Sequence, residues 1–132
     1  MRIELVVGDW SKDGHGISET FLFEVNLNKE QIYKAYKKGS KILGYDLIET
    51  KCRGYEESSV TELWWKEFLE ATKTKDEDYT VDGAYNGNIS IYPETWAQMY
   101  WAVCKLGDES LTYEEVENDG RIEINGYGLC NL

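Results

Sequence analysis

Residues 19–44, ETFLFEVNLNKEQIYKAYKKGSKILG, contain two hydrophobic periodicities, and the change between them decides the local fold. Up to Leu27, apolar side chains alternate with polar ones, which predicts a β-strand with one buried face. After Leu27, apolar residues recur every three or four positions, which predicts an amphipathic helix ending near Gly44. Asn28 and Gln31 form the pattern of a capping box at its start. The segment therefore predicts a strand that passes directly into a helix.

A second strand is expected before this segment. Residues 3–9 carry apolar side chains at every second position, beginning at Ile3. The connection over residues 10–18 is too short to hold a crossover helix. The two strands should therefore form an antiparallel hairpin with a long loop.

Three further helices are expected: a short one beginning at Asp46, one over residues 59–72, and one over residues 94–106. Ser59 and Glu62 have the spacing of a capping box. Pro93 suits the first turn of the last helix, and Gly107 suits its C-terminal end.

Two more hairpins complete the predicted fold. One covers residues 80–92, with Asn86-Gly87 as the turn, and the other joins residues 111–117 to 121–125. Three hairpins predict a mostly antiparallel sheet with the helices packed on one face, which is an α+β fold. The length of 132 residues fits a single domain over residues 1–132.

The composition predicts a soluble cytoplasmic protein. Apolar residues make up 42% of the chain, with five Trp and ten Tyr, which is enough to build a core. No uncharged apolar run approaches the roughly 18–20 residues that span a bilayer. The charged start of the chain does not resemble a secretion signal. The three cysteines, Cys52, Cys104 and Cys130, have no metal-ligand spacing, which favours a reduced compartment.

Acidic residues are concentrated in the second half of the chain. Residues 1–55 have a net charge of +1, whereas residues 56–132 have a net charge of −12. Such a field repels nucleic acid and anionic membranes and attracts basic surfaces. The sequence therefore predicts a basic protein partner, with no direct nucleic-acid binding and no membrane binding. A lysine run is expected on the outer face of the first helix: Lys29, Lys34, Lys37, Lys38 and Lys41.

The segment from Asp9 to Gly16 resembles the first half of a calcium-binding loop. The pattern then fails, because Thr20 stands where a bidentate Glu is required. Asp and Gly are also common in ordinary turns, so a plain hairpin loop is the main interpretation. Asp9 and Asp13 are retained only as weak metal-ligand candidates, and with His15 they would form a metal-dependent hydrolase. No cofactor is predicted.

Aromatic residues offer a different kind of site. At 100° per residue, Trp101 lies in the same sector of the last helix as Glu94 and Lys105, whereas Tyr100 lies on the apolar side. An exposed Trp within a polar rim is typical of an interface anchor. The alternative is that a second layer of the fold covers Trp101. Trp64 and Trp65 are adjacent, so one of them is expected at the surface.

We therefore expect a small, acidic, non-enzymatic binding protein that inhibits or neutralises a basic nucleic-acid-handling partner and could act as a nucleic-acid mimic. Immunity proteins for nuclease toxins and phage-encoded anti-defence inhibitors are similar in size and charge, without any residue correspondence. The expected contact residues are Trp101, Tyr100, Trp65, Glu94, Glu114, Glu115 and Glu117. Two alternatives remain: a small-molecule or nucleotide-binding module with an aromatic pocket, and the hydrolase described above. The sequence does not define the oligomeric state.

Overall fold

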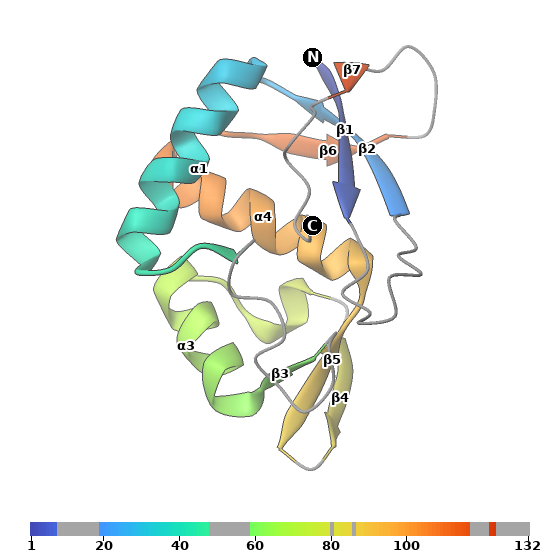
Figure 1. Ribbon diagram of the computed structural model, residues 1–132, viewed down its shortest axis with the longest axis vertical. Helices are drawn as coiled ribbons and strands as arrows, with labels where there is room; N and C mark the ends of the chain where they lie inside the picture. Colours follow the sequence, from blue (N-terminus) through green and yellow to red (C-terminus); the bar gives the residue numbers. More distant parts are fainter. Residues whose placement is uncertain (8–18, 48–58, 80, 86, 117–121, 124–132) are drawn as a thin grey trace.

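The computed structural model describes residues 1–7, 19–47, 59–79, 81–85, 87–116 and 122–123 (Figure 1). The helices are α1 (Lys29–Leu43), α3 (Glu62–Thr72) and α4 (Pro93–Gly107), with a short 3-10 helix, η1 (Asp76–Asp78). The strands are β1 (Arg2–Val7), β2 (Glu19–Val25), β3 (Ser59–Thr61), β4 (Val81–Tyr85), β5 (Asn88–Ile91), β6 (Tyr113–Glu115) and β7 (Ile122–Glu123). The predicted α+β class is confirmed.

The first sheet has four strands in the order β6-β2-β1-β7. Strands β1 and β2 pair antiparallel, as predicted, with Ile3 opposite Phe23. The alternation read from the sequence places Ile3, Leu5, Phe23 and Val25 in the core. Strand β6 adds antiparallel to β2, and β7 adds parallel to β1.

The predicted third hairpin is wrong. Residues 113–115 and 122–123 do form strands, but they lie on opposite edges of the first sheet and do not pair with each other. A two-stranded ribbon has two open edges, each with unpaired backbone N–H and C=O groups. With β6 on one edge and β7 on the other, backbone groups on both edges of the β1–β2 ribbon are paired. A separate hairpin of β6 and β7 would leave those groups without strand partners.

The second sheet has three antiparallel strands in the order β3-β5-β4. The predicted hairpin between β4 and β5 is confirmed, and Gly87 has the positive φ of 79° that such a turn requires. The strands therefore form two sheets, where the sequence predicted one. Because α3 continues directly from β3, it belongs to the second sheet (Figure 1), and the prediction that all helices pack on one face is not confirmed.

Helix α3 begins later than predicted. Residues 59–61 are a strand, in which Val60 pairs with Ile89 and is fully buried. The helix cap is Thr61, whose Oγ1 accepts a hydrogen bond of 3.1 Å from the Trp64 N–H. Ser59 could also have served as the N-cap, but residues 59–61 pair with β5, so the helix begins only after them.

Helix α1 follows the sequence prediction at both ends. The Asn28 side chain accepts a hydrogen bond from the Gln31 N–H, and the Gln31 side chain accepts one from the Asn28 N–H, both at 2.9 Å. Gly44 ends the helix with a φ of 97°. Beyond Leu47, the short helix predicted from Asp46 lies outside the described residues.

Helix α4 is buried on nearly every side. Its buried residues are Thr95, Trp96, Ala97, Met99, Tyr100, Trp101, Val103 and Cys104. Toward the first sheet, the Trp101 ring packs edge-on against Phe23 of β2, with centroids 5.4 Å apart. Toward α1, Tyr100 stacks on Tyr36 at 4.6 Å. Figure 1 shows α4 passing between these elements through the middle of the molecule.

Helices α1 and α4 cross at backbone contact. A Cβ atom added at Gly39 would lie 1.8 Å from the Val103 carbonyl oxygen, and one added at Gly107 would lie 1.9 Å from the Ala35 carbonyl oxygen. Gly107 was predicted as a helix stop, and it is the last residue of α4. It is also a packing residue, because any side chain there would push α1 away.

Gly39→Ala should lower the free energy of unfolding by about 3 kcal/mol or more, because its Cβ fits only if α1 and α4 separate. Gly44→Ala is the control, since it has a strained φ but nothing within 4 Å of the new Cβ. That variant should lose only about 1 kcal/mol. Urea unfolding measures both, and equal small losses would contradict the close crossing.

Candidate functional site

The three predicted aromatic anchors lie in the interior. Trp101 and Tyr100 are 0% exposed and Trp65 is 2% exposed. The prediction that they present a binding surface is therefore wrong for the chain in this conformation. The Trp65 indole N–H is also used internally, donating a hydrogen bond of 2.6 Å to Asp76 Oδ1.

The first sheet explains why Trp101 is buried. Its ring stacks on Tyr113 of β6 at 5.7 Å with an interplanar angle of 23°, and it contacts Phe23 of β2 on another side. Helical angles describe α4 alone, and they carry no information about a strand that arrives from elsewhere in the sequence. The alternative in which a second layer of the fold covers Trp101 is the correct one.

The predicted acidic contact residues occupy two places. Glu114 and Glu115 lie on β6 and are exposed, whereas Glu94 is exposed in the first turn of α4. Glu117 lies outside the described residues. Of the three predicted acidic residues that are described, Glu114 and Glu115 lie together, and Glu94 lies apart from them on α4.

Tyr113 is the aromatic residue that the sequence reasoning missed. It stands on β6 directly before Glu114, and it is 40% exposed although one face of its ring is stacked on Trp101. Edge-on contact with Phe23 at 5.8 Å fixes it from a second side. A Tyr that precedes two Glu residues in a predicted strand was the available signal. We refer to Glu24, Tyr113, Glu114 and Glu115 as the acidic edge.

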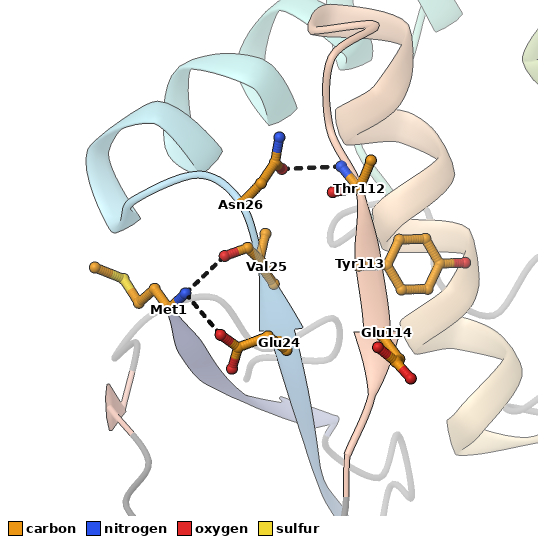
Figure 2. A pocket seen from close by; sticks show the side chains of 7 residues that line it. All are labelled: Met1, Glu24, Val25, Asn26, Thr112, Tyr113 and Glu114. Carbon is orange, nitrogen blue, oxygen red and sulfur yellow. Dashed lines mark hydrogen bonds and ion pairs between the residues drawn. The ribbon is translucent and has the colours of Figure 1, made fainter.

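A shallow depression of about 420 Å³ runs along this edge (Figure 2). Its lining residues are Met1, Glu24, Val25, Asn26, Thr112, Tyr113 and Glu114. The strand register places Glu114 directly opposite Glu24 on the outer face of the sheet. Glu24 is partly neutralised, because its carboxylate lies 3.5 Å from Arg2 Nε and 3.2 Å from the Met1 amino nitrogen.

Asn26 holds β6 in place against β2. Its side-chain oxygen accepts a hydrogen bond of 2.9 Å from the Thr112 N–H, and its amide nitrogen donates one of 2.8 Å to the Ser110 carbonyl (Figure 2 shows the first). The preceding turn is closed by Asp108, whose Oδ1 accepts bonds from the Ser110 hydroxyl and N–H. These bonds hold the pKa of Asp108 below its usual value.

Electrostatics link the edge to η1. The pKa of Tyr113 is raised by burial and further by the nearby Asp78 carboxylate. Among the described residues, no cation lies within ion-pair distance of Glu114 or Glu115. The edge thus combines two carboxylates without a described cation partner, Glu114 and Glu115, with one fixed aromatic ring.

Two other hollows lie elsewhere on the described surface. A depression of about 450 Å³ lies between the C-terminal ends of α3 and α4 and is lined by Lys73, Lys105 and Glu109 among others. Another, of about 180 Å³, lies beside Lys34 and Lys38 on α1. The space between α4 and the first sheet holds buried aromatic rings, so the described residues form no aromatic pocket there.

The metal candidates Asp9, Asp13 and His15 lie outside the described residues. Within the residues that are described, no three or more His, Cys, Asp or Glu side chains gather in a metal-binding arrangement. Cys104 is buried, and burial raises the pKa of its thiol well above the usual range. In that same part of the chain, no helix has the length and apolar character needed to cross a membrane.

Comparison with known proteins adds no further guide. No family model matches the chain, and neither a curated protein nor a solved structure does.

Trp101→Ala should cost about 3–5 kcal/mol in the free energy of unfolding, because it removes a ring packed between Phe23, Tyr100 and Tyr113. Tyr33→Ala is the control, since this aromatic side chain on α1 is 48% exposed, and it should cost less than about 1 kcal/mol. Urea unfolding separates the two. A small loss for Trp101→Ala would mean that the ring is not a core residue.

Tyr79 gives the protein an alkaline pH dependence. Burial is the main cause that raises its pKa from 10.0 to about 12. The unfolded chain loses this proton first, so the free energy of unfolding should fall as pH rises from about 10 to 12, by up to about 1.4 kcal/mol per pH unit. Tyr79→Phe should remove this contribution, whereas Tyr33→Phe, at a half-exposed position, should retain it. Denaturant unfolding across that pH range measures the difference.

Proposed function

We propose that this chain is a small, acidic, non-enzymatic binding protein that inhibits or neutralises a basic protein that handles nucleic acid. The observation that supports this best is the acidic edge, where Glu114 and Glu115 follow an exposed Tyr113 that is stacked on the core. In function it would belong with immunity proteins for nuclease toxins or with phage-type anti-defence inhibitors. That assignment rests on size, charge and this surface, not on residue correspondence.

Charge supplies the attraction. A site that binds nucleic acid is lined with Lys or Arg, which neutralise phosphates. The Glu114 and Glu115 carboxylates have no described cation partner, so they can occupy such phosphate-binding positions as a nucleic-acid mimic. The field of residues 56–132, with a net charge of −12, would speed the approach of a basic partner at low salt.

Tyr113 supplies the anchor that the sequence assigned to Trp101. Stacking on Trp101 and the edge contact with Phe23 fix its ring before a partner arrives, so little side-chain entropy is lost on binding. Tyr is also favoured at interfaces, because it offers an apolar face and a polar hydroxyl. The buried Trp101 is therefore the support of the contact surface.

The double variant Glu114→Lys with Glu115→Lys should lose at least about tenfold in affinity for the basic partner that the wild-type chain retains from cells of its source. Stopped-flow association of that purified partner should also slow steeply as salt rises. The partner's binding to nucleic acid should be displaced by the wild-type chain and not by the variant.

Glu67→Lys with Glu70→Lys is the matched control, because both residues are exposed on α3 and the change in net charge is identical. This variant should bind nearly as well as wild type. Equal losses in the two double variants would show that net charge alone matters and would exclude the acidic edge. If wild-type and variant chains retain no basic protein, the proposed function fails.

A further inference from the structure

Strand β6 is the outermost described strand of the first sheet, since only β2 pairs with it. Residues 112–115 are all exposed, and no described strand covers the far side of β6. An edge strand offers a row of backbone N–H and C=O groups to which another extended chain can bind.

The hydrogen bonds define which β6 groups face outward. The Val116 N–H donates to the Leu22 carbonyl at 2.9 Å, and the Asn26 N–H donates to the Thr112 carbonyl at 3.3 Å. Antiparallel pairing alternates along a strand, so the even-numbered residues of this segment bond to β2. The N–H and C=O groups of Tyr113 and Glu115 therefore point away from β2, toward the open edge of the sheet.

Other edges of the molecule are less open to pairing. Strand β4 carries a register shift between Asp82 and Ala84, and such bulges protect an edge. Strand β3 continues directly into α3, so its edge ends where the helix begins. The register between β6 and β2 runs without a shift over its three pairs.

We propose that the basic partner docks by adding an extended strand to the open edge of β6. This inference rests on the proposed function, and it names the mode of recognition. Glu114 lies with Glu24 on the outer face of the sheet, whereas Tyr113 and Glu115 lie on the face that carries Trp101. The matching strand carries Lys or Arg on its outer face, beside Glu114, and apolar side chains on the face beside Tyr113.

Charge disfavours a second copy of this chain as the occupant. If two β6 strands paired antiparallel about a two-fold axis at residue 114, Glu114 would stand directly opposite its counterpart. That position is a non-hydrogen-bonded pair, in which side chains approach most closely, so the like charges would repel. A basic strand meets no such repulsion.

An eight-residue peptide of alternating lysine and valine is the probe. In antiparallel addition, the valines share the face of Tyr113 and their N–H groups point at β6, whereas the lysine N–H groups point away. N-methylation of the valines should weaken binding at least tenfold. N-methylation of the lysines, with the same charge and number of methyl groups, should leave binding within about twofold.

Two variants of the protein test the hydrogen bonding of β6 itself, at the N–H of Glu115. Glu115→Pro removes the outward N–H of Glu115, which makes no bond to β2, so the fold should persist. Glu115→Gln removes the same charge and keeps the N–H. Glu115→Pro should bind the unmodified peptide at least tenfold more weakly than Glu115→Gln. Hydrogen exchange should show new protection of the Tyr113 and Glu115 amides with the peptide bound.

Strand addition is overturned if both methylated peptides bind alike, or if millimolar unmodified peptide fails to bind. The peptide comparison uses the wild-type chain, so it holds even if Glu115→Pro does not fold. If charge reversal at Glu114 and Glu115 abolishes partner binding while N-methylation of the peptide has no effect, the partner binds the acidic edge through charge. That result excludes strand addition and leaves the proposed function intact.

Discussion

The close crossing of α1 and α4 is the constraint on which the rest of the structure depends. Backbone carbonyls of Val103 and Ala35 occupy the places where side chains at Gly39 and Gly107 would otherwise begin. With no side chains between them, the two helices pack at backbone distance along this side of α4. Beside this crossing, Tyr100 of α4 stacks on Tyr36 of α1, whereas Trp101 packs toward the first sheet and Trp96 toward α3.

Because α4 is buried, its side chains support the residues of the acidic edge. Trp101 fills the space beneath β6, so Tyr113 rests on a fixed surface and cannot sink into the core. Asn26 fixes the position of β6 against β2 through two side-chain hydrogen bonds, to the Ser110 carbonyl and the Thr112 N–H. The exposed ring and its two neighbouring carboxylates are thus held by the core, in the way that interface anchors are best presented.

Local features of the sequence were enough for part of this structure. The capping pair Asn28 and Gln31, the alternation in residues 19–27 and the turn at Gly87 each determine their own element, because the relevant contacts are close in sequence. The first turn of α3 was misplaced because Val60 is buried by pairing with β5, which is distant in sequence. The positions of β6 and β7 were missed for the same reason: edges of a sheet attract segments from anywhere in the chain.

The candidate site was only half predictable, since charge can be read from composition and exposure cannot. Glu114 and Glu115 were identified correctly as exposed, but the aromatic anchor was assigned to Trp101, one layer beneath the surface. The positive and negative side chains also lie on different elements, the lysines on α1 and the carboxylates of Glu114 and Glu115 on β6. The five lysines of α1 are exposed, so they would repel a basic partner of the proposed kind, whereas the acidic edge would attract it. A field with both signs orients an approaching protein as well as accelerating it, so the partner would meet β6 before it meets α1.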